Sequence, residues 1–219
     1  RDFCLSRGLG DVYKRQSHCS EEVFIMTKTL YLMRHGQTVF NLKGRIQGAS
    51  DSPLTTLGVR QAQSAKGYFE KHHITFDTIV SSSQERACET LENAVPNQNY
   101  KRLKGIKEWG FGLFEGESIE LLKAIKKPEN LYGDYVVPFG GESKSEVESR
   151  VYETLEDVVA NQTNQTALAV SHGSTIGLFI RKVLGNQEGS TYDIGNCHIL
   201  KFEYDDNQFK FIEIIDPTN

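Results

Sequence analysis

The sequence predicts an α/β fold with three layers, in which a mostly parallel central sheet lies between helices and carries an antiparallel hairpin at its edge. Short apolar runs with little alternation, typical of strands covered on both faces, occur at residues 29–33, 76–82 and 166–172. Amphipathic helical patterns separate these runs. The chain then closes with two alternating runs joined by an Asp-Asp-Asn turn, at residues 197–215, which predicts the hairpin.

Helical periodicity follows each predicted strand. A threonine at position 55 or 56 can cap the first long helix. Ser143 and Glu146 have the spacing of a capping box in front of the longest one. The expected elements are helices at about residues 56–72, 85–94, 143–162 and 173–184, a weak helix within residues 117–137 and a short strand at residues 100–106.

The first 25 residues differ from the rest of the chain. They lack apolar periodicity and a signal-peptide core, and "DVYKRQ" within them matches one reading frame of a sequencing-transposon end. We expect residues 1–25 to be a non-native or disordered extension and residues 26–219 to form one domain. A genuine flexible extension at the N-terminus is the alternative.

Charge and cysteine content exclude several classes of protein. The formal net charge is −4, with 25 Lys and Arg against 29 Asp and Glu, so the basic footprint of a nucleic-acid-binding protein is missing. No apolar stretch approaches the length of a membrane span. Cys88 and Cys197 lack metal-ligand spacing, and we expect them to be small buried hydrophobes in a reduced, cytoplasmic protein.

Two of the predicted strands end in the same kind of motif. "LYLM" runs into "RHG" at residues 34–36, and "LAV" runs into "SHG" at residues 171–173. In an open parallel sheet, ligands bind beyond the carboxyl ends of the strands. Arginine binds phosphate oxygens through a fork of donors, and a neutral imidazole can attack phosphorus when its other nitrogen is held. The sequence therefore predicts phosphoryl chemistry at this end of the sheet.

No motif for a metal or a nucleotide accompanies these residues. The sequence contains no HExxH, no DxD motif in a loop after a strand and no Walker loop. Neighbouring positive charges can offset the repulsion of a phosphate dianion on their own. We therefore expect neither a metal nor a cofactor.

Further blocks occur in a recognisable order along the chain. They read "LMRHGQTVFN", "RIQGASDSPLTTLGVRQA", "SSSQERACET", "KEWGFGLFEG", "GGES" and "VSHGSTI". By these blocks the chain resembles the histidine phosphatase superfamily, the phosphoglycerate-mutase-like group, over residues 28 to about 185. The resemblance implies the phosphoglycerate-mutase-like form of the predicted fold.

The resemblance also implies a role for each matching residue. His35 is the nucleophile that forms a phosphohistidine, and Arg34 and Arg86 bind the phosphoryl group. A protonated His172 binds it too and stabilises the transition state. Glu108 is the general acid and then the base that activates water. The implied substrate-binding set is Arg34, Thr38, Asn41, Gln47, Gly48, Arg86, Glu108, His172 and Gly173.

Several neighbouring residues have other expected roles. Glu115 and Glu117 lie close to Glu108 in the chain and are alternative acids. Trp109 and Phe111 are expected to shape the wall of the pocket. The other candidates are expected on solvated faces, at a helix end or in a strand, and these are Arg150, His72, His73 and His198.

These inferences favour a metal-independent phosphomonoesterase that acts on a small phosphorylated metabolite. Activity should be best on the acidic side of neutral, because Glu108 must start protonated. A phosphoglycerate mutase, which returns the phosphoryl group to the substrate, is the alternative. The mutases carry a longer stretch with arginine and tyrosine after the acid block, whereas residues 117–140 are short here. A third hypothesis, an inactive phospho-ligand-binding module, conflicts with the intact set of residues.

The identity of the substrate stays open. Residues 43–53 and 109–140 form the expected specificity loops. Few cations lie outside the core site, which favours a monophosphate over a bisphosphate. No nucleic-acid or membrane partner is expected, and the edge hairpin leaves a homodimer open. The apolar pocket candidates are Tyr132, Tyr135 and Phe139, and the cations that keep a bisphosphate open are Lys43, Arg45 and Lys104.

Overall fold

The computed structural model describes residues 27–125, 134–160, 165–185 and 192–219. In them, one sheet has the strand order β3-β2-β4-β1-β5-β6. The first four of these strands are parallel, and β5 joins β1 antiparallel and continues into β6 through a hairpin. This confirms the predicted mixed sheet. The strands are β1 (Lys28–Arg34), β2 (Thr78–Ser82), β3 (Lys101–Leu103), β4 (Thr166–Ser171), β5 (Ile199–Asp205) and β6 (Gln208–Ile215).

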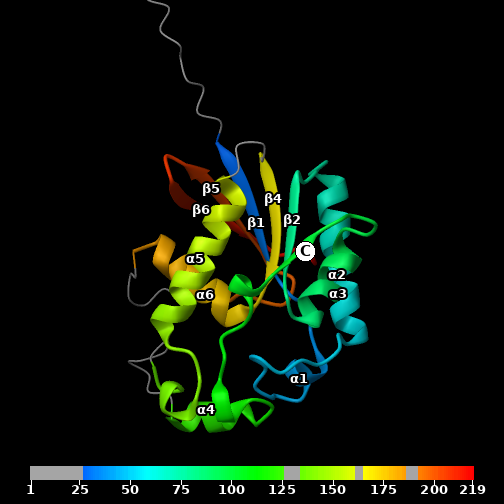
Figure 1. Ribbon diagram of the computed structural model, residues 1–219. Helices are drawn as coiled ribbons and strands as arrows, with labels where there is room; N and C mark the ends of the chain where they lie inside the picture. Colours follow the sequence, from blue (N-terminus) through cyan, green and yellow to red (C-terminus); the bar gives the residue numbers. More distant parts are fainter. Residues whose placement is uncertain (1–26, 126–133, 161–164, 186–191) are drawn as a thin grey trace, which may run out of the picture.

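Helices cover both faces of the sheet, as Figure 1 shows. Alternate residues of β1 explain the layering: Leu30 and Leu32 pack with α5 and α6, whereas Tyr31 and Met33 pack with α2 and α3. Both clusters are closed to solvent, so the buried middle of the strand, residues 30–33, carries no charged side chain. The three-layer prediction is therefore confirmed. The helices are α2 (Thr56–Lys71), α3 (Glu85–Ala94), α5 (Lys144–Ala160) and α6 (Gly173–Val183).

The predicted caps of the long helices form in the structure. The Thr55 side chain accepts a hydrogen bond from the backbone N–H of Gly58 at the start of α2. Ser143 and Glu146 make the reciprocal bonds of a capping box in front of α5.

Short elements gather below the carboxyl end of the sheet (Figure 1). Apolar side chains from two of these elements and from the adjoining loops form a third, smaller core with α5 and α6. Trp109 and Phe111, expected in a pocket wall, are buried in this core, with ring centroids 6.0 Å apart. We refer to these segments as the cap: α1 (Val39–Leu42), η2 (Gly112–Phe114), α4 (Ile119–Ile125) and η4 (Val137–Phe139).

The strand predicted after residue 100 is shorter in the structure. The strand expected at residues 100–106 ends at Leu103 and turns into η1 (Lys104–Ile106). The chain passes so close to α5 at this turn that a Cβ atom at Gly105 would lie 1.8 Å from the Thr154 hydroxyl. The turn therefore requires glycine at this position. Of the weak helix expected within residues 117–137, the structure describes α4 before and η4 after residues 126–133, which lie outside the described chain.

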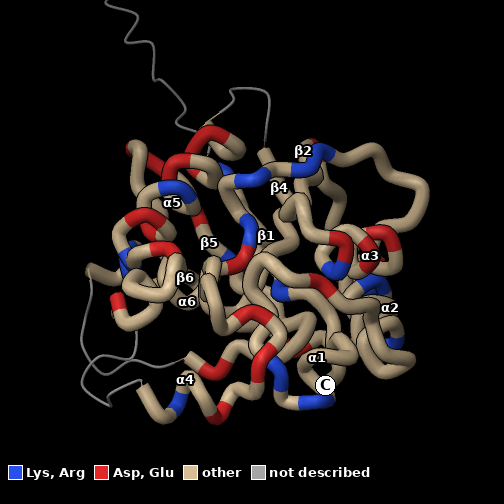
Figure 2. Tube along the Cα trace, turned by 60° about the horizontal axis from the view of Figure 1, so that its bottom comes forward, with Lys and Arg blue, Asp and Glu red and all other residues tan. Residues whose placement is uncertain are grey.

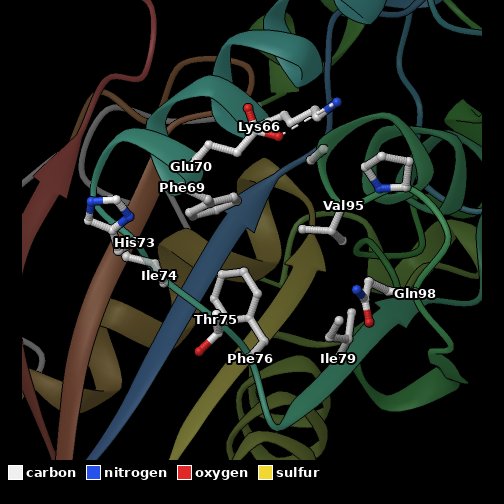
Figure 3. A pocket seen from close by; sticks show the side chains of 12 residues that line it. Lys66, Phe69, Glu70, His73, Ile74, Thr75, Phe76, Ile79, Val95 and Gln98 are labelled. Atoms are coloured by element: carbon white, nitrogen blue, oxygen red, sulfur yellow. Dashed lines mark ion pairs between the residues drawn. The ribbon is translucent and has the colours of Figure 1, made fainter.

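A cavity of about 520 Å³ lies at the opposite end of the molecule, between α2, α3 and the start of β2 (Figure 3). Phe69, Phe76 and Ile79 supply much of its lining, and Lys66 and Glu70 form an ion pair at 3.7 Å on its rim. No helix in the described ranges combines the length and apolarity needed to cross a membrane.

Candidate functional site

The parallel register of β1 and β4 brings the two histidine motifs together. Arg34 lies opposite Ser171 at the ends of these strands, so His35 and His172 follow side by side. Their ring centroids are 5.2 Å apart, and their exposed fractions are 3% and 0%. The sequence prediction that both motifs meet at the carboxyl end of the sheet therefore agrees with the structure.

His35 has the geometry of a nucleophile. Its Nδ1 atom lies 2.8 Å from the carbonyl oxygen of Gly36, which can only accept, so Nδ1 carries the proton and Nε2 keeps a lone pair. Burial, and then the charges of Arg86 and Arg34, hold the pKa of His35 well below its ordinary 6.5. The ring is therefore neutral near neutral pH, as attack on phosphorus requires.

His172 has the complementary arrangement. Its Nε2 atom lies 2.7 Å from the hydroxyl of Ser82, whereas its buried Nδ1 atom has no partner in the described chain. Burial and the charge of Arg86 lower the pKa of His172 as well. We expected a protonated His172 in the transition state, but this site favours the neutral ring. With the Ser82 hydroxyl donating to Nε2, the proton lies on Nδ1 and is available to an oxyanion.

Two arginines complete a group of buried donors. Arg86 is 1% exposed, and its terminal nitrogens contact the carbonyl of Gly48 at 3.0 Å and the carboxylate of Asp51 at 3.0 Å. The terminal nitrogen of Arg34 donates to the carbonyl of Ile194 at 2.6 Å. The Nε atoms of both arginines are buried and have no partner among the described residues. Buried donors without acceptors are costly and rare, so these point to an anionic ligand.

Gly173, which has no side chain, leaves space beside the Arg34 guanidinium. A Cβ atom at this position would lie 3.3 Å from the Arg34 Nε atom, in contact with the guanidinium. The charges of Arg34 and Arg86 act on both histidines, which places all four side chains in one electrostatic site. Other lysines and arginines are scattered among acidic residues over the described chain (Figure 2).

Glu108 belongs to the segment after η1, and its side chain reaches the start of α6, beside the second histidine motif. Its Oε1 atom accepts from the backbone N–H of Trp109 at 2.9 Å and that of Thr175 at 3.0 Å. Its Oε2 atom accepts only one longer bond, 3.2 Å from the N–H of Ser174. The carboxyl is buried and its charge acts on Arg34. Oε2 is therefore the oxygen with capacity to carry a proton.

Glu115, a competing candidate for the acid, has a structural task. Its carboxylate accepts from the backbone N–H groups of Gly48, Ala49 and Ser50, at 3.1, 2.7 and 2.9 Å, and from that of Phe111 at 2.9 Å. Burial raises the pKa of Glu115, but these donors outweigh it and leave the pKa below its ordinary value. The residue therefore anchors the loop that contacts Arg86. Glu117, the other competitor, is exposed.

The remaining predicted substrate-binding residues bond to one another. Thr38 caps α1, and its hydroxyl lies 2.6 Å from the side-chain oxygen of Gln47. The Asn41 side chain completes the capping box and meets Asn196, which in turn donates to the carbonyl of His35 at 3.0 Å. These contacts shape the loops around His35, and direct substrate binding by these residues stays a prediction.

Sequence reasoning missed several residues of the site. Ser82 orients His172, and Gln84 accepts from the N–H of Glu108 at 2.8 Å and donates to the carbonyl of Gly48. The run of serines at the end of β2 is the sequence signal that could have identified Ser82. Asn196, from the segment before β5, has no motif around it and is brought to His35 by the fold alone.

The assignment of Arg150 to a solvated face is wrong. Its side chain is 18% exposed and pairs with Glu142 at 2.9 Å, behind the segment that carries Glu108. The surface was expected because the helix is rich in charges, but the guanidinium points inward to backbone carbonyls.

Other predicted positions lie away from the histidines or outside the described chain. Lys43 and Lys104 are exposed, and Arg45 donates to the carbonyl of Gly116 at 2.6 Å. Phe139 packs edge-on against Phe114 in the cap. His72 and His73 follow the end of α2, and Tyr135 joins the core of the cap, whereas Tyr132 is outside the described residues.

His198 stands just before β5 and accepts from the N–H of Gly195 at 3.0 Å, so it is structural as expected. Within the described ranges, no group of three His, Cys, Asp or Glu side chains is arranged to hold a metal ion.

Known proteins share this sequence pattern and this arrangement of strands. The family model for the histidine phosphatase superfamily (branch 1) matches residues 30–217. A probable phosphoglycerate mutase GpmB from Proteus mirabilis is 32% identical over 183 residues, which cover 80% of this chain and 84% of that relative.

Solved structures extend the likeness to the fold. A phosphoglycerate mutase from Bacillus anthracis superposes with a TM-score of 0.76 at 24% identity, over 88% of this chain and 94% of that one. A phosphoserine phosphatase from Entamoeba histolytica, in complex with 3-phosphoglyceric acid, has a TM-score of 0.70 at 28% identity, over 85% and 96%. With its two histidine motifs at the carboxyl end of a phosphoglycerate-mutase-like sheet, this chain belongs to the histidine phosphatase superfamily.

Proposed function

We propose that this protein is a metal-independent phosphomonoesterase that hydrolyses a small phosphorylated metabolite through a phosphohistidine. One observation carries the proposal: three buried nitrogen atoms without hydrogen-bond partners in the described chain, Nε of Arg34, Nε of Arg86 and Nδ1 of His172, accompany a neutral His35. Such donors stabilise the equatorial oxygens of a phosphoryl group during transfer.

The first half of the reaction forms a bond to His35. Its Nε2 lone pair attacks phosphorus while the bond from phosphorus to the ester oxygen breaks. Glu108 gives its proton to the departing oxygen, so that an alcohol leaves and not an alkoxide. The arginines and His172 hold the phosphoryl oxygens throughout.

The second half restores the enzyme. Glu108, now a carboxylate, takes a proton from water as the water oxygen attacks phosphorus and the bond from phosphorus to Nε2 breaks. Inorganic phosphate leaves, and both residues return to their starting protonation states. The low pKa of His35 supports the expected optimum on the acidic side, because the nucleophile stays neutral below the ordinary pKa of a histidine.

The remaining cations support a substrate with one phosphoryl group. Arg150 faces the same end of the sheet, but all its N–H groups are used by the protein. Arg45 is bound to the cap backbone, and Lys43 and Lys104 are exposed. A second anionic group on the substrate would therefore meet few buried cations in the described chain. The phosphoserine phosphatase among the similar structures is consistent with hydrolysis.

Phosphoglycerate mutase activity is the second candidate, because the Proteus mirabilis relative bears that name. In a mutase the phosphohistidine returns its phosphoryl group to the substrate and no net phosphate is released. The same residues would carry both reactions, so only the products distinguish them.

The test follows both products from one substrate. Protein starting at Met26 is incubated in EDTA with 3-phosphoglycerate and with a panel of phosphorylated metabolites, and phosphate and 2-phosphoglycerate are measured. We expect phosphate release that is lost in His35→Ala. Formation of the isomer without phosphate would favour the mutase, and no turnover of any compound would favour a phospho-ligand-binding module.

A further inference from the structure

We propose that Glu142 and Arg150 form a clamp that positions the acid residue Glu108. The inference rests on the proposed role of Glu108 and extends it to two residues that touch neither the histidines nor the phosphoryl site. Both belong to segments outside the strand ends, Glu142 just before α5 and Arg150 within it.

Every donor of Arg150 has an acceptor on or beside the acid segment. Its Nη1 atom donates to the carbonyls of Gly105 and Lys107 at 2.8 and 2.7 Å. Its Nη2 atom donates to the carbonyl of Glu108 at 3.1 Å and to Glu142 at 2.9 Å, and Nε donates to Glu142 at 3.0 Å. A guanidinium has five N–H groups in a rigid fork, so this set is complete.

Glu142 holds the same segment from its other side. Its carboxylate accepts from the N–H of Gly110 at 2.8 Å and lies 3.3 Å from the ammonium of Lys107. Its carbonyl accepts from the indole of Trp109 at 2.7 Å, and its own N–H donates to the carbonyl of Gly110 at 2.9 Å. Residues 107–110 are thus bound continuously, by backbone and side chain together.

The backbone of Glu108 is consequently held on both sides. Gln84 binds its N–H, and Arg150 binds its carbonyl. Beyond this point the carboxyl accepts from the backbone N–H of Trp109 and from those of Ser174 and Thr175 at the start of α6. Proton delivery depends on where Oε2 lies relative to the leaving oxygen, and a misplacement of about 1 Å can cost about 100-fold in rate. The clamp therefore acts on the acid step through position.

The kinetic test compares leaving groups. An alkyl monophosphate such as β-glycerophosphate needs a proton on its leaving oxygen, whereas p-nitrophenyl phosphate releases a stable anion and needs less help. We expect Arg150→Lys, which keeps the charge but loses the fork, to lower kcat/KM about 100-fold for the alkyl ester and less than about threefold for the aryl ester. Because kcat/KM reports the first transfer, the later water step does not obscure the difference.

A matched control separates positioning from general damage. Arg102 and Glu85 form another arginine–glutamate pair, at 2.6 Å, but both side chains are exposed. Arg102→Lys should leave kcat/KM for both esters within about twofold of the wild-type value, as expected for an exposed pair. Equal losses on both esters in Arg150→Lys would mean a structural role only and would overturn the clamp, as would no loss at all.

The double variant identifies the residue through which the clamp acts. Glu108→Gln alone should lower kcat/KM for the alkyl ester by about 10²–10⁴. If Arg150 acts through Glu108, adding Arg150→Lys to Glu108→Gln should cost less than about threefold more, because the acid is already absent. Additive losses would overturn the clamp while leaving the proposed function intact. Equal effects of Glu108→Gln on both esters would overturn the acid assignment and the clamp with it.

Discussion

The two ends of the sheet differ in the kind of side chains that they bury. At the carboxyl end, His35, His172 and Arg86 are buried, and three of the donors in the site have no partner in the described chain. At the amino end, the cavity of about 520 Å³ has aromatic and aliphatic walls such as Phe69, and its ion pair lies on the rim (Figure 3). The first end lowers stability by burying unpaired polar groups, whereas the second loses only dispersion contacts.

The comparison separates a candidate site that contains unpaired polar groups from a hollow that packing alone explains. Buried donors without partners are rare, and a ligand that supplies their acceptors is one explanation for them. An apolar hollow at the edge of a core needs no such explanation. Catalytic effects should therefore be confined to the carboxyl end, and substitutions at the amino end should change stability alone.

The largest expected effect is loss of the nucleophile. His35→Ala should reduce kcat by at least about 10⁴-fold, because no other group can form the covalent intermediate. The measurement is phosphate release together with acid-labile labelling of the protein by a radioactive substrate. His73→Ala, on the rim of the amino-end cavity, is the control and should retain both signals. Labelling of His35→Ala at the wild-type level would contradict the assignment.

Removal of one phosphoryl-binding cation should have the next largest effect. Arg86→Gln should lower kcat/KM by about 10²–10³, since a preorganised donor to the transition state is lost and Asp51 keeps an uncompensated charge nearby. The double variant Arg86→Gln, Asp51→Asn removes that charge as well. Activity of Arg86→Gln within threefold of wild type would show that Arg86 serves the loop and not the substrate.

The two buried histidines should make stability depend on pH. Their pKa values are held well below 6.5, first by burial and then by Arg86, so the unfolded chain binds protons that the folded chain does not. The free energy of unfolding should be highest above about pH 6.5 and should fall as the pH decreases. Each histidine lowers it by at most about 1.4 kcal/mol per pH unit.

Urea unfolding at pH 7, 6 and 5 measures this dependence, with His172→Asn beside wild type. The variant should show a shallower dependence on pH, and the exposed His72→Asn variant is the control. Identical curves for wild type and His172→Asn would mean that His172 is charged in the folded protein.

The smallest expected effect on catalysis comes from the amino end. Phe69→Leu should lower the free energy of unfolding by about 1 kcal/mol through lost packing, with kcat/KM unchanged within about twofold. Chemical denaturation and the esterase assay on the same preparation provide both values. A catalytic loss of tenfold or more would show that the two ends are coupled through α2 and α3.

Much of the fold could be predicted because its signals are local. The buried strands before residues 34 and 171, the threonine cap of α2 and the capping box of α5 all depend on neighbours in the chain. Prediction failed where tertiary contacts override periodicity. The strand after residue 100 ends early because Gly105 packs on α5, and Arg150 turns inward although its helix is rich in charges.

The layered α/β architecture and the two histidine motifs could be inferred from the residues alone, since periodicity and the order of blocks are properties of neighbouring residues. Which backbone segments surround each acidic side chain could be seen in the tertiary structure alone. Glu108, Glu115 and Glu142 all accept hydrogen bonds from backbone N–H groups, but of the three it is the Glu108 carboxyl that lies at the start of α6, beside the second histidine motif. The reason is physical: the role of a buried carboxylate is set by the donors around it, and here those come from segments distant in sequence.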